Sequence, residues 1–77
     1  MATKEQLRAF ITAQPFLPFV IRMTGGRVFT IAHPENAACD PKGRALVILD
    51  RAGIHQAEML LVEVMEPADT TPSGNGP

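Results

Sequence analysis

Apolar and polar residues alternate along two short stretches that flank a pair of glycines. The alternation runs through residues 19–23 before Gly25 and Gly26, and through residues 27–31 after them. A period of two is typical of a strand that buries one face and exposes the other. The pattern therefore predicts a β-hairpin turning at the glycines.

The same pattern selects the length of the hairpin loop. A two-residue loop would place Arg22 beside Phe29 and mix the two faces, whereas a three-residue loop over 24–26 pairs Ile21 with Phe29 on one apolar face. A slip of one residue turns every side chain of a strand to the opposite face. We therefore predict the longer loop, a type I turn followed by a left-handed residue, with positive φ at Gly26.

A short helix is predicted before the hairpin, over residues 3–13. Thr3 opens a capping box, in which its side chain accepts a hydrogen bond from an unpaired amide of the first turn. Leu7, Phe10 and Ile11 then fall on one face. The helix is too short to persist alone, so this face is expected to pack on the rest of the domain.

Turn-forming residues divide the remainder of the chain into short β-forming segments. The predicted strands, hairpin included, cover residues 18–24, 27–33, 37–40, 44–50, 54–59 and 61–65. From residue 67 onward Pro, Gly, Ser and Thr dominate, which predicts a disordered tail over 67–77. The expected result is one mainly β domain over 1–66, because no second helix is present for β-α-β crossovers.

Composition narrows the functional classes. The 77 residues carry 7 Lys and Arg against 8 Asp and Glu, a net charge of −1, so no strong field points to nucleic acid or to an anionic membrane. The single cysteine, Cys39, excludes an intramolecular disulfide. The polar start of the chain does not resemble a signal peptide, and no apolar stretch is long enough to span a membrane. We expect a cytoplasmic location and no membrane partner.

Candidates for catalysis or metal binding are few. Ser73 is the only serine and lies in the predicted tail, which excludes a serine-nucleophile triad inside the fold. Cys39 with His33 or His55 could form a nucleophile–base pair or contribute zinc ligands. No metal-binding spacing and no third, orienting group accompanies them. We expect a non-enzymatic protein without a cofactor, and keep a thiol- or metal-dependent enzyme as a minor alternative.

Two other segments hold candidate interaction residues. Phe16 and Leu17 lie between two prolines, where they either seal the helix against the core or, if exposed, form an interaction patch. His33 begins a proline-containing turn, and we expect a tight corner in which Asn36 or His33 bonds the local backbone.

Three sequence segments together resemble a known group of proteins. PFLPFVI at 15–21, GRVFTI at 26–31 and HPE at 33–35 are similar to the PFxPFxI, GRxFxV and HPE motifs of short, uncharacterised bacterial proteins. The resemblance covers about residues 7–65 and implies no particular activity. The layout is also similar to SH3-like and Sm-like small barrels, which implies a barrel of five to six short strands with one N-terminal helix. Sm-like proteins form rings by pairing edge strands and bind RNA.

These observations lead to a non-enzymatic binding or scaffolding module as the expected function. Residues 45–49 are rich in β-formers and lack strong charges that would guard an open edge, which suggests self-association there, with binding to another protein also possible. The alternative is an Sm-like RNA-binding ring in which Arg22, Arg27 and Arg44 contact phosphates.

Overall fold

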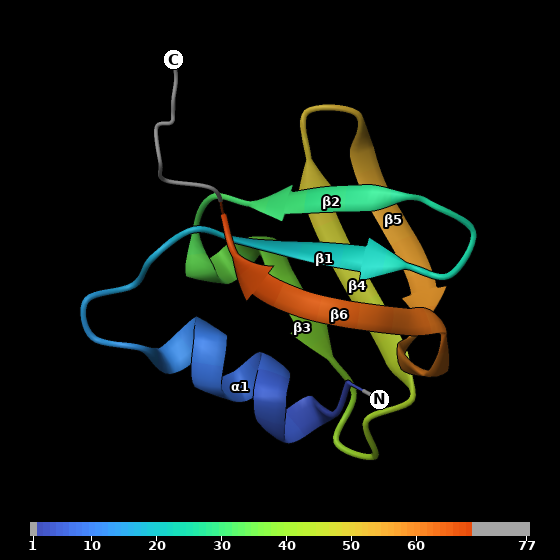
Figure 1. The fold of residues 1–77 in the computed structure, drawn as a ribbon, viewed down its shortest axis with the longest axis horizontal. Coiled ribbons are helices and arrows are strands. Elements are labelled where there is room, and N and C mark those ends of the chain that lie inside the picture. Colours follow the sequence, from blue (N-terminus) through green and yellow to red (C-terminus); the bar gives the residue numbers. More distant parts are fainter. Residues whose placement is uncertain (1, 69–77) are drawn as a thin grey trace.

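A computed structural model describes residues 2–68 of the chain. These residues form one α-helix, six strands and two short 3-10 turns, so the predicted mainly β domain with an N-terminal helix is confirmed (Figure 1). In chain order the elements are α1 (Lys4–Thr12), β1 (Phe19–Met23), β2 (Val28–Ile31), η1 (Pro34–Asn36), β3 (Ala37–Cys39), β4 (Ala45–Asp50), β5 (Gly53–Glu58), η2 (Met59–Leu61) and β6 (Val62–Pro67).

The strands form two antiparallel sheets that run across one another (Figure 1). We name them the β1 sheet, with strand order β2–β1–β6, and the β4 sheet, with order β3–β4–β5. The turn η1 carries the chain from β2 in one sheet to β3 in the other, and α1 packs beside β3 and η1. Within residues 2–68 the strands do not close into a barrel, so the observed architecture is two packed sheets.

The predicted hairpin register is confirmed. Ile21 faces Phe29, and Gly26 has a φ of +96°. The type of turn was predicted wrongly. Gly25 also has a positive φ, +94°, and the Gly26 amide donates to the Met23 carbonyl at 3.1 Å. Positive φ at the third residue of a four-residue turn is typical of type II, which the absence of a Cβ at Gly25 permits.

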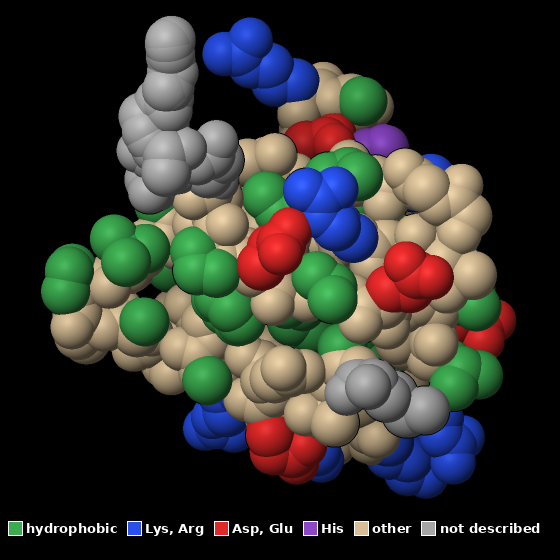
Figure 2. Space-filling model, viewed as in Figure 1, with side chains coloured by type: hydrophobic (Ala, Val, Ile, Leu, Met, Phe, Trp, Pro, Cys, Tyr) green, Lys and Arg blue, Asp and Glu red, His purple; other side chains and the backbone are tan. Residues whose placement is uncertain are grey.

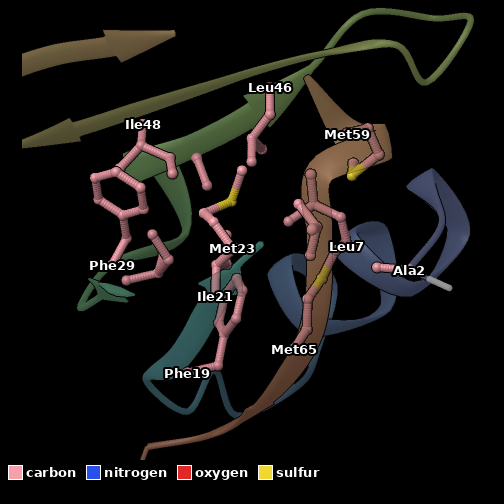
Figure 3. Packing of buried hydrophobic residues seen from close by; sticks show 13 residues of the cluster. Ala2, Leu7, Phe19, Ile21, Met23, Phe29, Leu46, Ile48, Met59 and Met65 are labelled. Atoms are coloured by element: carbon pink, nitrogen blue, oxygen red, sulfur yellow. The ribbon is translucent and has the colours of Figure 1, made fainter. Parts of the chain in front are cut away.

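The core lies between the two sheets. Phe19 and Ile21 of β1 point toward Leu46 and Ile48 of β4, and Leu7 closes the core from α1 (Figure 3). All five side chains are almost inaccessible to solvent. Complete burial of one such side chain stabilises the fold by about 1.5–3 kcal/mol, so this cluster holds both sheets and the helix together.

The predicted helix start and apolar face are also confirmed. The Gln6 amide donates to Thr3 Oγ1 at 3.2 Å, and the Thr3 amide donates to Gln6 Oε1 at 3.3 Å, which completes the capping box. Leu7 is buried, and Phe10 and Ile11 pack against the core as partly buried residues. The helix therefore docks through the face that the sequence predicts.

The prediction that residues 45–49 form an open edge is wrong. They belong to β4, which pairs with β3 on one side and with β5 on the other. The main-chain amides and carbonyls of a central strand are hydrogen-bonded to the strands on both sides. Such a strand therefore needs no charged side chains to prevent pairing with another molecule.

The last strand, β6, extends two residues beyond the predicted 61–65 and is followed by a hydrogen bond from the Ala68 amide to the Pro18 carbonyl. Residues 69–77 of the predicted tail lie outside the described residues. The helices within residues 2–68 are too short and too polar to cross a membrane.

Candidate functional site

The residues considered for catalysis do not come together. Cys39 lies in β3 opposite Leu46, whereas His55 lies in β5 opposite Ile48, so β4 stands between them. His33 precedes η1 at the corner between the sheets. The structure therefore separates the three side chains that a thiol- or metal-dependent site would need.

The environment of Cys39 also disfavours a reactive thiolate. Burial raises the pKa of the Cys39 thiol above its ordinary value, and the negative charge of Asp40 raises it further. A thiol activated as a nucleophile needs the opposite shift. Across residues 2–68, no three His, Cys, Asp or Glu side chains gather closely enough to hold a metal ion.

His55 takes part in a local contact network at the end of β4 and β5. Its Nε2 lies 2.9 Å from Asp50 Oδ1, which also accepts a hydrogen bond from the Ala52 amide at 2.8 Å. The hydrogen bond with His55 is the main cause that lowers the pKa of Asp50. The imidazole packs against the ring of Phe29 at 5.2 Å, and the Arg27 guanidinium lies over the same ring at 4.9 Å. This network ties the β4–β5 hairpin to the β1 sheet.

Arg22 is separated from the other two candidate arginines. It lies on the outer face of the β1 sheet, where its Nε forms a 2.6 Å ion pair with Glu66 Oε2. Figure 2 views the molecule from the side of this sheet and shows positive and negative side chains dispersed among hydrophobic ones. Arg22 would have to leave Glu66 to contact a phosphate.

Arg27 and Arg44 line one broad hollow of about 1030 Å³ around η2. The start of α1, the end of the β1–β2 hairpin and the turn between β3 and β4 form its other walls. We call it the basic hollow, because four of its charged residues are basic and two are acidic: Lys4, Arg27, Lys42, Arg44, Glu5 and Glu58. Lys4 and Lys42 were not predicted as site residues from the sequence. Each is isolated from other basic residues along the chain and comes near them only in the folded structure.

The turn between β3 and β4 is held in place by hydrogen bonds on both sides. Asp40 Oδ1 accepts from the main-chain amides of Arg44 and Ala45, at 2.6 and 2.9 Å. These bonds lower the pKa of Asp40. From the other side, Lys4 Nζ donates to the Pro41 carbonyl. The basic hollow therefore has one preorganised wall.

Phe16 and Leu17 have different roles. Phe16 packs edge-on against Phe19 with ring centroids 6.1 Å apart, and it belongs to the partly buried shell of the core. Leu17 is 62% exposed and lines a small apolar hollow of about 270 Å³ that also contains Pro67. Phe16 therefore seals the core, as the first interpretation expected, and Leu17 is left at the surface.

The corner at His33 has the local hydrogen bond that the sequence predicts. The His33 amide donates to Asn36 Oδ1 at 3.1 Å, and the Asn36 amide donates to the His33 carbonyl at 3.0 Å. The side chain of His33 is exposed. Both hydrogen bonds use the main chain of His33, so they do not depend on its imidazole.

Strand β5 forms one side of the β4 sheet, and its outer side lacks a partner strand within residues 2–68. The Met59 amide donates to the Arg44 carbonyl at 2.7 Å, so Arg44 and Met59 form a hydrogen-bonded pair. In an antiparallel ladder every second pair of facing residues is hydrogen-bonded, which identifies the other bonded pairs of β4 and β5. The pairs bonded in the same way are Leu46–Ala57, Ile48–His55 and Asp50–Gly53.

The intervening residues of β5 therefore direct their main-chain groups away from β4. We call this row of outward groups, on Ile54, Gln56 and Glu58, the β5 edge. Its register with β4 is regular along all six residues. Ile54 is 75% exposed, the highest value among the large hydrophobic residues described.

Strand β6, an edge of the β1 sheet, is irregular. Its register with β1 shifts between Arg22 and Met23, so that Glu63 has no facing residue. The bond from Ala68 to Pro18 places Pro67 among the residues whose main chain faces outward, and proline has no amide to donate. A bulge, a charged residue and a proline are devices that prevent edge pairing.

In comparisons with known proteins, no family model matches the chain, and no curated protein or solved structure is significantly similar to it. The resemblance to short bacterial proteins therefore stays a prediction.

Proposed function

We propose that the chain is a non-enzymatic binding module that self-associates through the β5 edge. The observation that carries this proposal is a regular six-residue strand whose outward amides and carbonyls have no partner within residues 2–68. Such an edge is a template for another strand, and it is here accompanied by an exposed isoleucine. The predicted cytoplasmic location remains part of this proposal.

The proposal includes a relationship of this fold to SH3-like and Sm-like small barrels. The β1 sheet has the order β6–β1–β2 and the β4 sheet has the order β3–β4–β5, while η1 connects β2 to β3 in the chain and η2 precedes β6. This order supports kinship with SH3-like and Sm-like small barrels. In that arrangement β5 and β6 are the two ends of the strand order, where association between copies would add a strand.

Light scattering during size exclusion, over a range of protein concentrations, tests the self-association. We expect a mass that rises with concentration, and we expect Gln56→Pro to abolish the rise. The substitution removes an outward amide and places a ring on the edge, while the bonds to β4 come from the neighbouring residues.

The matched control is Thr30→Pro. Thr30 also directs its amide outward, but on the edge of β2. Ile54→Lys is a second test that leaves the backbone unchanged, because lysine is a common guard of open edges. Circular dichroism verifies the fold of each variant. A wild-type protein that stays monomeric at all concentrations would contradict the proposal, as would equal effects of the two prolines.

Nucleic-acid binding is a second candidate function, favoured by the basic hollow. Arg27, Lys42 and Arg44 have no carboxylate within 4 Å among residues 2–68. The residues that line the hollow include no aromatic side chain on which a base could stack, which weakens this candidate. Anisotropy of a labelled oligouridylate at low and moderate salt tests it. Binding that falls with salt and is lost in Arg44→Glu, but not in Arg8→Glu on α1, would favour this candidate.

A further inference from the structure

We infer that two copies of the chain join β5 to β5 about a two-fold axis, which makes one continuous six-stranded sheet from the two β4 sheets. This inference rests on the self-association proposed above. Beyond self-association, it specifies the two strand edges that pair, the symmetry of the dimer and the residues near its two-fold axis.

The four outer strands differ in their capacity to accept another strand. β2 has four residues and β3 has three, and α1 packs beside β3. β6 has six residues, but its bulge at Glu63 and its outward-facing Pro67 interrupt the row of donors. Among these four outer strands of the described residues, only β5 combines length, regular register and the absence of proline. A ring that joins β5 to β6 would pair one regular edge with one edge interrupted by a bulge and a proline. Pairing of β5 with a second β5 instead joins two regular edges.

Antiparallel pairing of two β5 strands also satisfies the alternation of main-chain groups. The outward groups belong to the even-numbered positions 54, 56 and 58, so each even-numbered residue must face an even-numbered residue of the partner strand. Registers centred on Gln56 or on His55 meet this condition and keep the outer face of each sheet aligned with that of its partner. A register shifted by one residue would oppose inward and outward groups and is therefore excluded.

The charges at the two ends of β5 are complementary under this symmetry. Arg51 lies in the turn before β5 and Glu58 is its last residue, and both are exposed. Antiparallel pairing brings Arg51 near Glu58 of the partner subunit, and the two-fold axis repeats this contact. A parallel arrangement would instead place like charges together at each end.

The exposed isoleucine also gains cover. Ile54 lies on the outer face of β5 beside Leu49 of β4, which is itself 40% exposed. A second β5 strand would cover Ile54 from the open side. The contact is limited to one strand pair and its flanking side chains, so we expect a weak dimer that forms in a concentration-dependent way.

Spin labelling tests the symmetry directly. The only native cysteine, Cys39, is replaced by alanine, and a nitroxide is attached at Gln56→Cys on the outer face of β5. In the register centred on Gln56 the two labelled residues face one another, with Cα atoms about 5.5 Å apart, and in the register centred on His55 they are diagonal neighbours about 7–8 Å apart. The two labels should therefore show strong dipolar broadening in the dimer in either register. Dilution with unlabelled protein should remove the broadening, and a label at Thr30→Cys on β2 should show none.

The three possible outcomes separate the two proposals. Broadening at position 56, with a mass that stops at the dimer, supports the two-fold arrangement. Association without broadening at position 56, or growth beyond the dimer, overturns the two-fold arrangement and leaves self-association standing. A protein that stays monomeric by light scattering at every concentration overturns both.

Discussion

The ring of Phe10 in α1 stacks on the ring of Phe19 in β1, with centroids 4.7 Å apart and planes inclined by 25°. Phe19 is completely buried, whereas Phe10 is partly covered. This contact joins the only α-helix of the described residues to the strand at the centre of the β1 sheet. The docking of α1 therefore depends on a specific aromatic pair as well as on Leu7.

Loss of this aromatic pair should destabilise the domain. We expect Phe10→Ala to lower the free energy of unfolding by about 2 kcal/mol, because it removes both the stacking and the burial of a ring. Phe10→Leu keeps much of the apolar volume and should cost clearly less. Urea unfolding followed by circular dichroism measures both, since a chain without Trp or Tyr lacks the usual fluorescence signal. Equal stability of wild type and Phe10→Ala would show that α1 does not depend on this contact.

The turn between β3 and β4 should tolerate a side chain at Gly43 poorly. Its φ is +73°, and a Cβ there would lie 3.1 Å from the Cβ of Lys4. Gly43→Ala should therefore lower the free energy of unfolding by about 1–3 kcal/mol. Gly26→Ala is the matched control, because Gly26 also has positive φ but open space around it. The prediction requires that Gly43→Ala cost more than Gly26→Ala in the same urea titration.

The carboxylate of Asp40 should contribute stability that depends on pH. Main-chain amides lower its pKa in the folded state. A lowered folded pKa means that the contribution is complete above the pKa of the unfolded chain, about 4 for Asp, and disappears as pH falls through the folded value. Asp40→Ala should therefore be less stable than wild type at neutral pH.

The difference in unfolding free energy between wild type and Asp40→Ala should shrink as pH falls from about 5 to about 2. Asp40→Asn keeps an oxygen acceptor without the charge, so it should be intermediate at neutral pH. Urea unfolding at a series of pH values checks both variants. A difference that stays constant over this range would mean that the ionised form is not what stabilises the turn.

Reversal of the charges at the ends of β5 should weaken the proposed dimer, and mixing should restore it. Arg51→Glu or Glu58→Arg alone should each raise the dimer dissociation constant about fivefold, since two symmetric surface ion pairs contribute about 1 kcal/mol in total. An equimolar mixture of the two variants forms a heterodimer in which both contacts are again between opposite charges. Sedimentation equilibrium should therefore show that the mixture associates more strongly than either variant alone.

The control for this experiment is Arg8→Glu, which changes the net charge by the same amount on α1, away from β5. It should leave the dissociation constant unchanged at moderate salt, because distant exposed charges are screened. Failure of the mixture to recover would indicate that Arg51 and Glu58 of the partner subunit do not meet.

The sequence predicted local features correctly where a single interaction between residues close in the chain determines the conformation. The pairing of Ile21 with Phe29 follows from keeping apolar residues on one face, and positive φ at Gly26 follows from the loop length. The capping box at Thr3 and the corner at Asn36 are contacts between residues three positions apart. The type of the hairpin turn was missed because two adjacent glycines permit several conformations at similar cost.

The set of elements could be predicted from the amino-acid pattern: a capped helix, six short strands and the turns that separate them all depend on periodicity and on local hydrogen bonds. Which strands lie at the edges depends on strand pairing between distant parts of the chain. The apolar content of residues 45–49 is compatible with either an edge or a centre, and β4 became central because β3 and β5 both pair with it. In the same way, Arg22 is joined to Glu66 across 44 positions, and the basic residues around η2 come from three separate segments. Edges and charged surfaces depend on neighbours distant in sequence, and their placement appears only when the two sheets pack.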